Sequence, residues 1–120
     1  MADAPGSVAD IPIVDTDSHI CEPPDLWTSR LSQARWGDLI PHVEFDERVG
    51  RDRWVIGGSK LTSVANYAIA GWREHPPSHP PTLAEADPGA FEAKPRLARM
   101  DEYGIYAQTL YPNLLAFSHH

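Results

Sequence analysis

Two metal-binding residue types occur two positions apart in VDTDSHICEPPDLW, which covers residues 14–27. Asp17 and His19 are separated by one residue, and on a strand residues i and i+2 lie on the same face. A carboxylate oxygen and an imidazole nitrogen are both ligands of zinc or manganese, so the two side chains can reach one ion. The spacing alone leaves a second interpretation open, in which Asp17 caps a turn and His19 hydrogen-bonds to the backbone.

Four other residues are of types that could take part in chemistry, but their positions in the sequence give weaker evidence for a site. Asp15 lies on the same strand face one step deeper, and we interpret it as structural. Cys21 is the only cysteine of the chain, and a lone cysteine beside a strand end is usually a small buried hydrophobe. His75 and His79 are four residues apart, but the prolines between them prevent a helix. We therefore expect both histidines in an exposed loop.

The composition excludes several classes of function. The chain has 120 residues, 42% of them hydrophobic, which suits one domain with a single core. Its net charge of −7 offers no basic surface for nucleic acid and is repelled by an anionic membrane. We find neither an apolar run long enough to span a membrane nor a signal-peptide pattern. A single cysteine also fits a reducing compartment, so the sequence predicts a cytoplasmic protein.

The first half of the chain predicts a strand, a helix and an inserted hairpin. Residues 11–20 read as the strand that carries the candidate ligand pair, and residues 23–36 predict a short helix that begins at two prolines. Two strands at about 42–47 and 52–57 form the hairpin. The proline-rich residues 71–89 predict an exposed loop with extended pieces. Core or insertion packing is expected for the tryptophans, which are Trp27, Trp36, Trp54 and Trp72.

The second half predicts a helix followed directly by a strand. Pro95 suits a first helical turn and Gly104 a C-terminal cap, so residues 94–103 should be helical. The residues of this helix that we expect to face a core are Leu97, Met100 and Tyr103. A helix between two strands is the crossover that parallel pairing needs, which predicts an α/β fold. The candidate ligands then lie at the carboxyl end of the first strand, where βα loops build active sites.

Three stretches of the chain resemble the opening portion of the amidohydrolase-related family. They are IVDTDSHICEPPDLW, the residues around WVIGGSKL, and PRLARMDEYGIYAQTLYPN, and the resemblance runs from residue 11 to residue 113. This family includes aminocarboxymuconate semialdehyde decarboxylase and the resorcylate decarboxylases. The resemblance implies a metal-dependent (β/α)8 barrel that hydrolyses C–N or C–O bonds or removes carboxylate from aromatic and unsaturated acids.

The resemblance also implies roles for individual residues. The family's first-strand ligand pair, often His-x-His, falls on Asp17 and His19, with aspartate in place of the first histidine. The implied cofactor is a divalent metal, with zinc favoured over manganese. Glu22 resembles an acidic residue that follows the motif in some relatives, and it is our candidate catalytic residue, orienting His19 or lining the pocket. A solvated turn carboxylate is the alternative interpretation of Glu22.

We therefore expect residues 1–120 to form a single partial domain, the first part of a (β/α)8 barrel with an inserted hairpin. A closed barrel needs about 250 residues, so the chain is less than half of one. The leading hypothesis is the metal-binding portion of an enzyme acting on a small molecule. The alternative is a non-catalytic remnant or interaction module. An open sheet edge and an uncovered apolar face would also favour a homo-oligomer.

Overall fold

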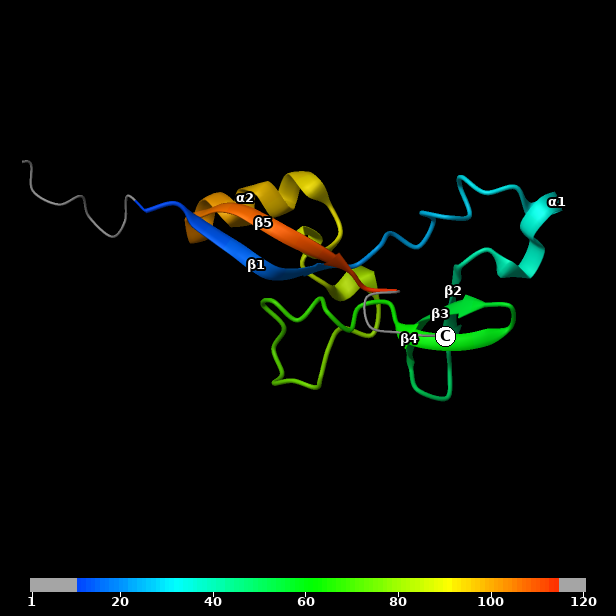
Figure 1. Cartoon of the computed structure of the whole chain (residues 1–120). Helices are drawn as coiled ribbons and strands as arrows, with labels where there is room; N and C mark the ends of the chain where they lie inside the picture. Colours follow the sequence, from blue (N-terminus) through cyan, green and yellow to red (C-terminus); the bar gives the residue numbers. More distant parts are fainter. Residues whose placement is uncertain (1–10, 115–120) are drawn as a thin grey trace, which may run out of the picture.

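The structure is a computed structural model that describes residues 11–114 of the chain. Its strands form two separate sheets, shown in Figure 1. The first is a parallel pair of β1 (Ile13–Ile20) and β5 (Ile105–Pro112), and the second is antiparallel and contains β2 (His42–Asp46), β3 (Arg51–Ile56) and β4 (Ser59–Ser63). The antiparallel sheet lies beyond the carboxyl ends of β1 and β5 (Figure 1).

The helix α2 (Ala93–Tyr103) directly precedes β5 in the chain and lies against the β1–β5 pair (Figure 1). It ends at Gly104, whose φ of 70° is left-handed and whose N–H donates to the carbonyl oxygens of Met100 and Asp101. The chain then enters β5 at once. The predicted helix, its glycine cap, the following strand and their α/β arrangement with parallel pairing are therefore confirmed.

The predicted hairpin is confirmed, but it has a third strand that the sequence analysis did not predict. The predicted strands correspond to β2 and β3, which pair in antiparallel register. The second predicted strand ends at residue 57, and the sequence of Gly57 and Gly58 is typical of a chain that leaves a strand. Their φ values of 56° and 76° instead build a two-residue turn into β4. A tight two-residue hairpin turn requires positive φ at both central residues, which glycine adopts easily. The glycine pair was therefore a signal in the sequence for a third strand.

The hydrophobic core lies between the antiparallel sheet, the segment that follows β4, and the carboxyl ends of the parallel pair. Trp54 of β3 is fully buried and meets Trp27 in an edge-to-face contact with ring centroids 5.1 Å apart. The other buried members of this cluster are Cys21, Val64, Ala65, Ala68, Leu83 and Leu114. The core therefore joins the ends of β1 and β5 to the insertion.

The helix predicted for residues 23–36 is mostly wrong. Residues 24–30 form turns, and only α1 (Gln33–Trp36) is helical, followed by the 3-10 turn η2 (Gly37–Leu39). The hydroxyl of Ser29 donates to the carbonyl oxygen of Asp25 at 2.6 Å, which is the local bonding by which serine competes with a regular helix. No residue of α1 is buried, so no tertiary contact extends the helix.

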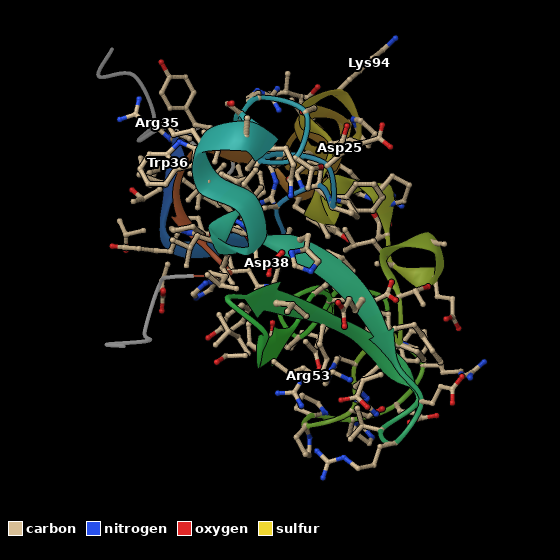
Figure 2. All side chains as sticks on the ribbon, turned by 90° about the vertical axis from the view of Figure 1, so that its right-hand side faces the viewer. Asp25, Arg35, Trp36, Asp38, Arg53 and Lys94 are labelled. Atoms are coloured by element: carbon tan, nitrogen blue, oxygen red, sulfur yellow. The ribbon has the colours of Figure 1, made fainter. Side chains whose placement is uncertain are left out.

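Trp36 corrects the expectation that every tryptophan packs in the core or the insertion. Its side chain is exposed, and the guanidinium of Arg35 lies 5.0 Å from its ring centroid. Figure 2 shows both side chains projecting from α1. An arginine over an indole face is a surface cation–π contact.

The loop predicted for residues 71–89 is more ordered and more buried than expected. It contains the 3-10 turns η3 (Leu83–Glu85) and η4 (Pro88–Ala90), and Pro80 is fully buried. His75 is exposed as predicted, whereas His79 is half-buried and its Nε2 lies 2.8 Å from Nη1 of Arg51. Because Arg51 is on β3, this contact holds the loop against the antiparallel sheet.

The outer surface of α2 also differs from the prediction. Leu97 and Tyr103 were expected to face a core, but they are 60% and 62% exposed, while Met100 is half-buried. Among the described residues, the apolar side of this helix lacks a covering layer. No helix within residues 11–114 is long and apolar enough to cross a membrane. His119 and His120 lie outside the described residues.

Candidate metal centre

Asp17 and His19 come together near the carboxyl end of β1, as the strand spacing predicts. Nε2 of His19 lies 3.8 Å from Oδ1 of Asp17. Two ligands of a tetrahedral zinc ion with bonds near 2.0 Å would be roughly 3.3 Å apart, so a small movement lets both atoms bind one ion. The side chain of Asp17 is 83% exposed and that of His19 is 19% exposed. The donor pair therefore fits a divalent metal that approaches from solvent.

Two tyrosines enclose the imidazole of His19. The ring of Tyr67 stacks on it with centroids 4.2 Å apart and planes 12° apart. Tyr111, which pairs with His19 across the sheet on β5, lies 5.9 Å away and is tilted by 44°. Neither tyrosine was singled out in the sequence, because each meets His19 only through tertiary contacts. The ring of the candidate ligand is thus held between an inserted segment and the neighbouring strand.

Asp15 has the structural role that we expected, although its geometry differs from a regular strand. The register of the β1–β5 pairing shifts between Asp15 and Ser18, which ends simple alternation. Asp15 accepts hydrogen bonds from the Ser18 hydroxyl at 2.5 Å, from the Asp17 N–H at 3.1 Å, and from the Gln108 amide at 3.2 Å. These donors, the Ser18 hydroxyl first, hold the pKa of the Asp15 carboxyl below its usual range. The ionised Asp15 carboxylate therefore stabilises the irregular backbone at Asp17 and Ser18.

Arg96 connects α2 to the same part of β1. Its Nη2 donates to the carbonyl oxygen of His19 at 2.7 Å, and its Nη1 donates to Oε1 of Gln108 at 3.2 Å. The sequence analysis missed this residue. The available signal was its position four residues before Met100, since residues i and i+4 of a helix share a face. The guanidinium fixes the backbone of the candidate ligand from the helix side.

Glu22 is buried, with 7% of the residue exposed, so the alternative of a solvated turn carboxylate is wrong. Its Oε1 accepts from the N–H of Leu114 at 3.1 Å and its Oε2 from the N–H of Asn113 at 3.2 Å. The side-chain amide of Asn113 in turn donates to the carbonyl oxygen of Val64 at 2.5 Å. Glu22 therefore ties the chain after β1 to the chain after β5, and through Asn113 to the insertion.

Cys21 is the small buried residue that the sequence predicted. It is 1% exposed, and burial raises the pKa of its thiol to about 11. Burial therefore favours the neutral thiol, and a buried neutral cysteine behaves as a small hydrophobic residue. Cys21 thus packs in the hydrophobic core next to the candidate site.

A cavity of about 530 Å³ opens beside the ligand pair. Asp17 and His19 line it together with Tyr67, Arg96, Met100 and Tyr103. Glu22, which we expected to orient His19 or to line the pocket, is not among the lining residues, and its carboxylate binds the N–H groups of Asn113 and Leu114 instead. The size of the cavity falls in the range of small-molecule sites, and its walls combine a few polar groups with apolar and aromatic side chains. The candidate ligands therefore face a space that can hold a small molecule.

Within residues 11–114 there is no group of three or more histidine, cysteine, aspartate or glutamate side chains arranged to hold a metal ion. A catalytic zinc site usually has three protein ligands and a water. The described residues thus offer two candidate ligands, fewer than such a site usually has.

Comparison with solved structures finds a similar fold in the amidohydrolase map2389c from Mycobacterium avium subsp. paratuberculosis K-10, with a TM-score of 0.59. The two chains are 20% identical, and the match covers 87% of this chain but 31% of the amidohydrolase. No family model and no curated protein matches the chain. The chain thus spans about a third of the length of its structural neighbour, and its described part has an amidohydrolase-like fold.

Proposed function

We propose that the chain forms the metal-binding opening portion of an amidohydrolase-like (β/α)8 enzyme. In this proposal β1 and β5 are the first two barrel strands, α2 is the helix between them, and the three-stranded sheet is an insertion. Asp17 and His19 bind a divalent metal, zinc or manganese, and later strands supply the remaining ligands. The observation that carries the proposal is the 3.8 Å approach of Asp17 and His19 beside a cavity at the carboxyl end of β1.

The position of this pair agrees with the general design of barrel enzymes. Their active sites lie at the carboxyl ends of the parallel strands, and catalytic residues come from several strand ends. When bound, such a metal polarises a carbonyl or carboxyl oxygen or activates a water. Asp17 adds a negative charge to the ligand set, and Glu22 supports the site by joining the two strand ends.

The proposed reaction is hydrolysis of a C–N or C–O bond or nonoxidative decarboxylation of a small carboxylic acid. Both reactions use a metal as a Lewis acid, and both suit a cavity of this size. The 120-residue chain alone should show no turnover, since two ligands do not complete a catalytic site.

Isothermal titration of the metal-free chain with zinc tests the ligand assignment. We expect weak binding that Asp17→Ala and His19→Ala each reduce by more than about tenfold, because removing even an indirect partner of a metal ligand costs 10–100-fold. Asp25→Ala is the matched control, since Asp25 is an exposed aspartate on the turn after β1. Equal zinc affinity in the wild type and in both ligand variants would disprove the metal site.

A second candidate function is a non-catalytic module that associates with a second copy of itself. The observation that favours it is the exposure of apolar residues on β1, β5 and α2, which are Ile13, Val14, Leu97, Tyr103, Tyr106 and Leu110. Sedimentation at increasing concentration separates the two functions. Self-association that Leu97→Lys abolishes, in a chain that does not bind zinc, would favour the module.

A further inference from the structure

We propose that Tyr67 is a positioning residue that fixes the plane of the His19 imidazole before a metal binds. The metal part of this inference rests on the proposed function, but the effect on the imidazole does not. Nothing in the sequence around Tyr67 marks it, because it follows β4 in an irregular segment far from β1 in the chain. The inference assigns the segment that follows β4 a role in the candidate metal site.

The contact between the two rings carries the first step of the argument. Planes only 12° apart and centroids 4.2 Å apart define a face-to-face stack. Rotating the imidazole about its bond to Cβ would turn its face away from the tyrosine and break this stack. Tyr111 lies near the same ring at 5.9 Å and further limits such rotation. In the stacked orientation Nε2 of His19 is directed to the side on which Asp17 lies.

The second step is that Tyr67 is itself held in place. It lies between Val64 and Ala65, which are fully buried, and Ala68, which is nearly so. The N–H of Ala68 donates to the carbonyl oxygen of Ala65 at 3.0 Å, which closes the backbone turn around Tyr67. A side chain can fix a neighbour only when its own backbone is rigid, and this segment meets that condition.

Two contacts attach this segment to the strand ends beside the site. The backbone of Tyr67 hydrogen-bonds to the thiol of Cys21, directly after β1. The carbonyl oxygen of Val64 accepts from the side-chain amide of Asn113, directly after β5. The insertion is thereby anchored to both parallel strands, and the stacked ring reaches His19 from a fixed direction.

A role in positioning differs measurably from simple packing. If Tyr67 only fills space, an aliphatic side chain of similar bulk should serve equally well. If Tyr67 sets the plane of the imidazole, an aromatic ring is required and the hydroxyl is not. Tyr67→Phe keeps the ring, whereas Tyr67→Leu and Tyr67→Met keep apolar bulk without a planar face.

The test is NMR of the His19 ring protons in the metal-free full chain at about pH 8, above the range in which histidine side chains usually titrate. Tyr67 should shift these protons upfield through its ring current, and Tyr67→Phe should preserve the shift. Both aliphatic variants should lose it and should show more than one orientation of the imidazole. Two aliphatic variants are used so that misfolding of one, detected by far-ultraviolet circular dichroism, still leaves a measurement.

Zinc titration of the same variants gives the second readout. We expect Tyr67→Phe to bind within about twofold of the wild type and the aliphatic variants to bind about tenfold more weakly, as for other indirect partners of metal ligands. An unchanged imidazole orientation in folded aliphatic variants would overturn the inference. Zinc binding that is insensitive to His19→Ala would instead overturn the proposed function, and the NMR result would remain interpretable.

Discussion

The antiparallel sheet and the parallel pair differ in how well they bury their own apolar residues. In the sheet, Trp54 and Val55 of β3 are buried, and Trp54 packs in one cluster with Val64, Ala65 and Ala68 of the segment after β4. In the parallel pair, Ile13 and Val14 of β1 are more than half exposed, and Tyr106 of β5 is 76% exposed. The strands of the parallel pair contain more apolar residues than those of the antiparallel sheet, so composition does not explain the difference.

The difference follows from the number of layers that each region has. Three strands and the folded segment after them enclose a core. The parallel pair has α2 against it and two open edges within the described residues (Figure 1). All-parallel sheets are normally covered on both faces, and under the proposed function the exposed residues are where further barrel strands and helices would pack.

The largest effect that separates the two regions should come from truncation of their large apolar residues. Trp54→Ala removes a fully buried indole and should lower the free energy of unfolding by about 3–5 kcal/mol. Leu97→Ala on α2 should change it by less than about 0.5 kcal/mol, because this leucine is largely exposed. Urea denaturation followed by circular dichroism measures both.

A large loss of stability from Leu97→Ala would contradict this comparison. It would show that the outer side of α2 is covered in solution, by another part of the chain or by a second copy. Repeating the denaturation at several protein concentrations distinguishes these two causes, since only association makes the midpoint depend on concentration.

A smaller effect is expected at the junction of the two regions. Glu22→Ala leaves the N–H groups of Asn113 and Leu114 without their carboxylate acceptor in a buried place, which should cost about 1–3 kcal/mol. Asp25→Ala is again the control, because this exposed carboxylate lies three residues away on a turn. Equal unfolding free energies for the two variants would mean that Glu22 does not join the strand ends.

The smallest effect should come from the ion pair between η4 and α2. Arg99 donates to Oδ2 of Asp87 at 2.6 Å, and the carboxylate also accepts from the N–H of Gly89 at 2.8 Å. These contacts, Arg99 first, hold the pKa of the Asp87 carboxyl below its usual range. A lowered pKa stabilises the fold at pH values above the unfolded pKa near 4, and this stabilisation is lost as the pH falls through the folded pKa.

Two variants separate the stabilisation that comes from the charge of Asp87 from the stabilisation that comes from its hydrogen bond with the Gly89 N–H. Asp87→Asn keeps an oxygen for Gly89 and removes the charge, so it should cost about 0.5 kcal/mol at pH 7, as partly exposed pairs do. Asp87→Ala also removes the cap and should cost about 1 kcal/mol more. Both differences should shrink between pH 5 and pH 3 in urea denaturation. A difference that is constant over this range would exclude the charge as its source.

Much of the local structure is determined by the sequence. Pro95 lies in the first turn of α2, which proline suits, and Gly104 caps its end because glycine adopts a left-handed conformation without strain. The two-residue spacing of Asp17 and His19 predicts that their side chains lie close together, and they do so although the pairing register shifts between Asp15 and Ser18. These features depend on neighbours close in the chain, which is why a pattern in the sequence predicts them.

Tertiary structure decided the surroundings of the site. The stack of Tyr67 on His19, the hydrogen bonds of Glu22 to Asn113 and Leu114, and the exposure of Leu97 all join or separate residues far apart in the chain. The free energy of such contacts depends on which surfaces the folded chain brings together, and local propensity contains no information about it. The sequence by itself therefore determined the two candidate ligands. The tertiary structure decided which side chains contact them and which apolar residues near them stay exposed.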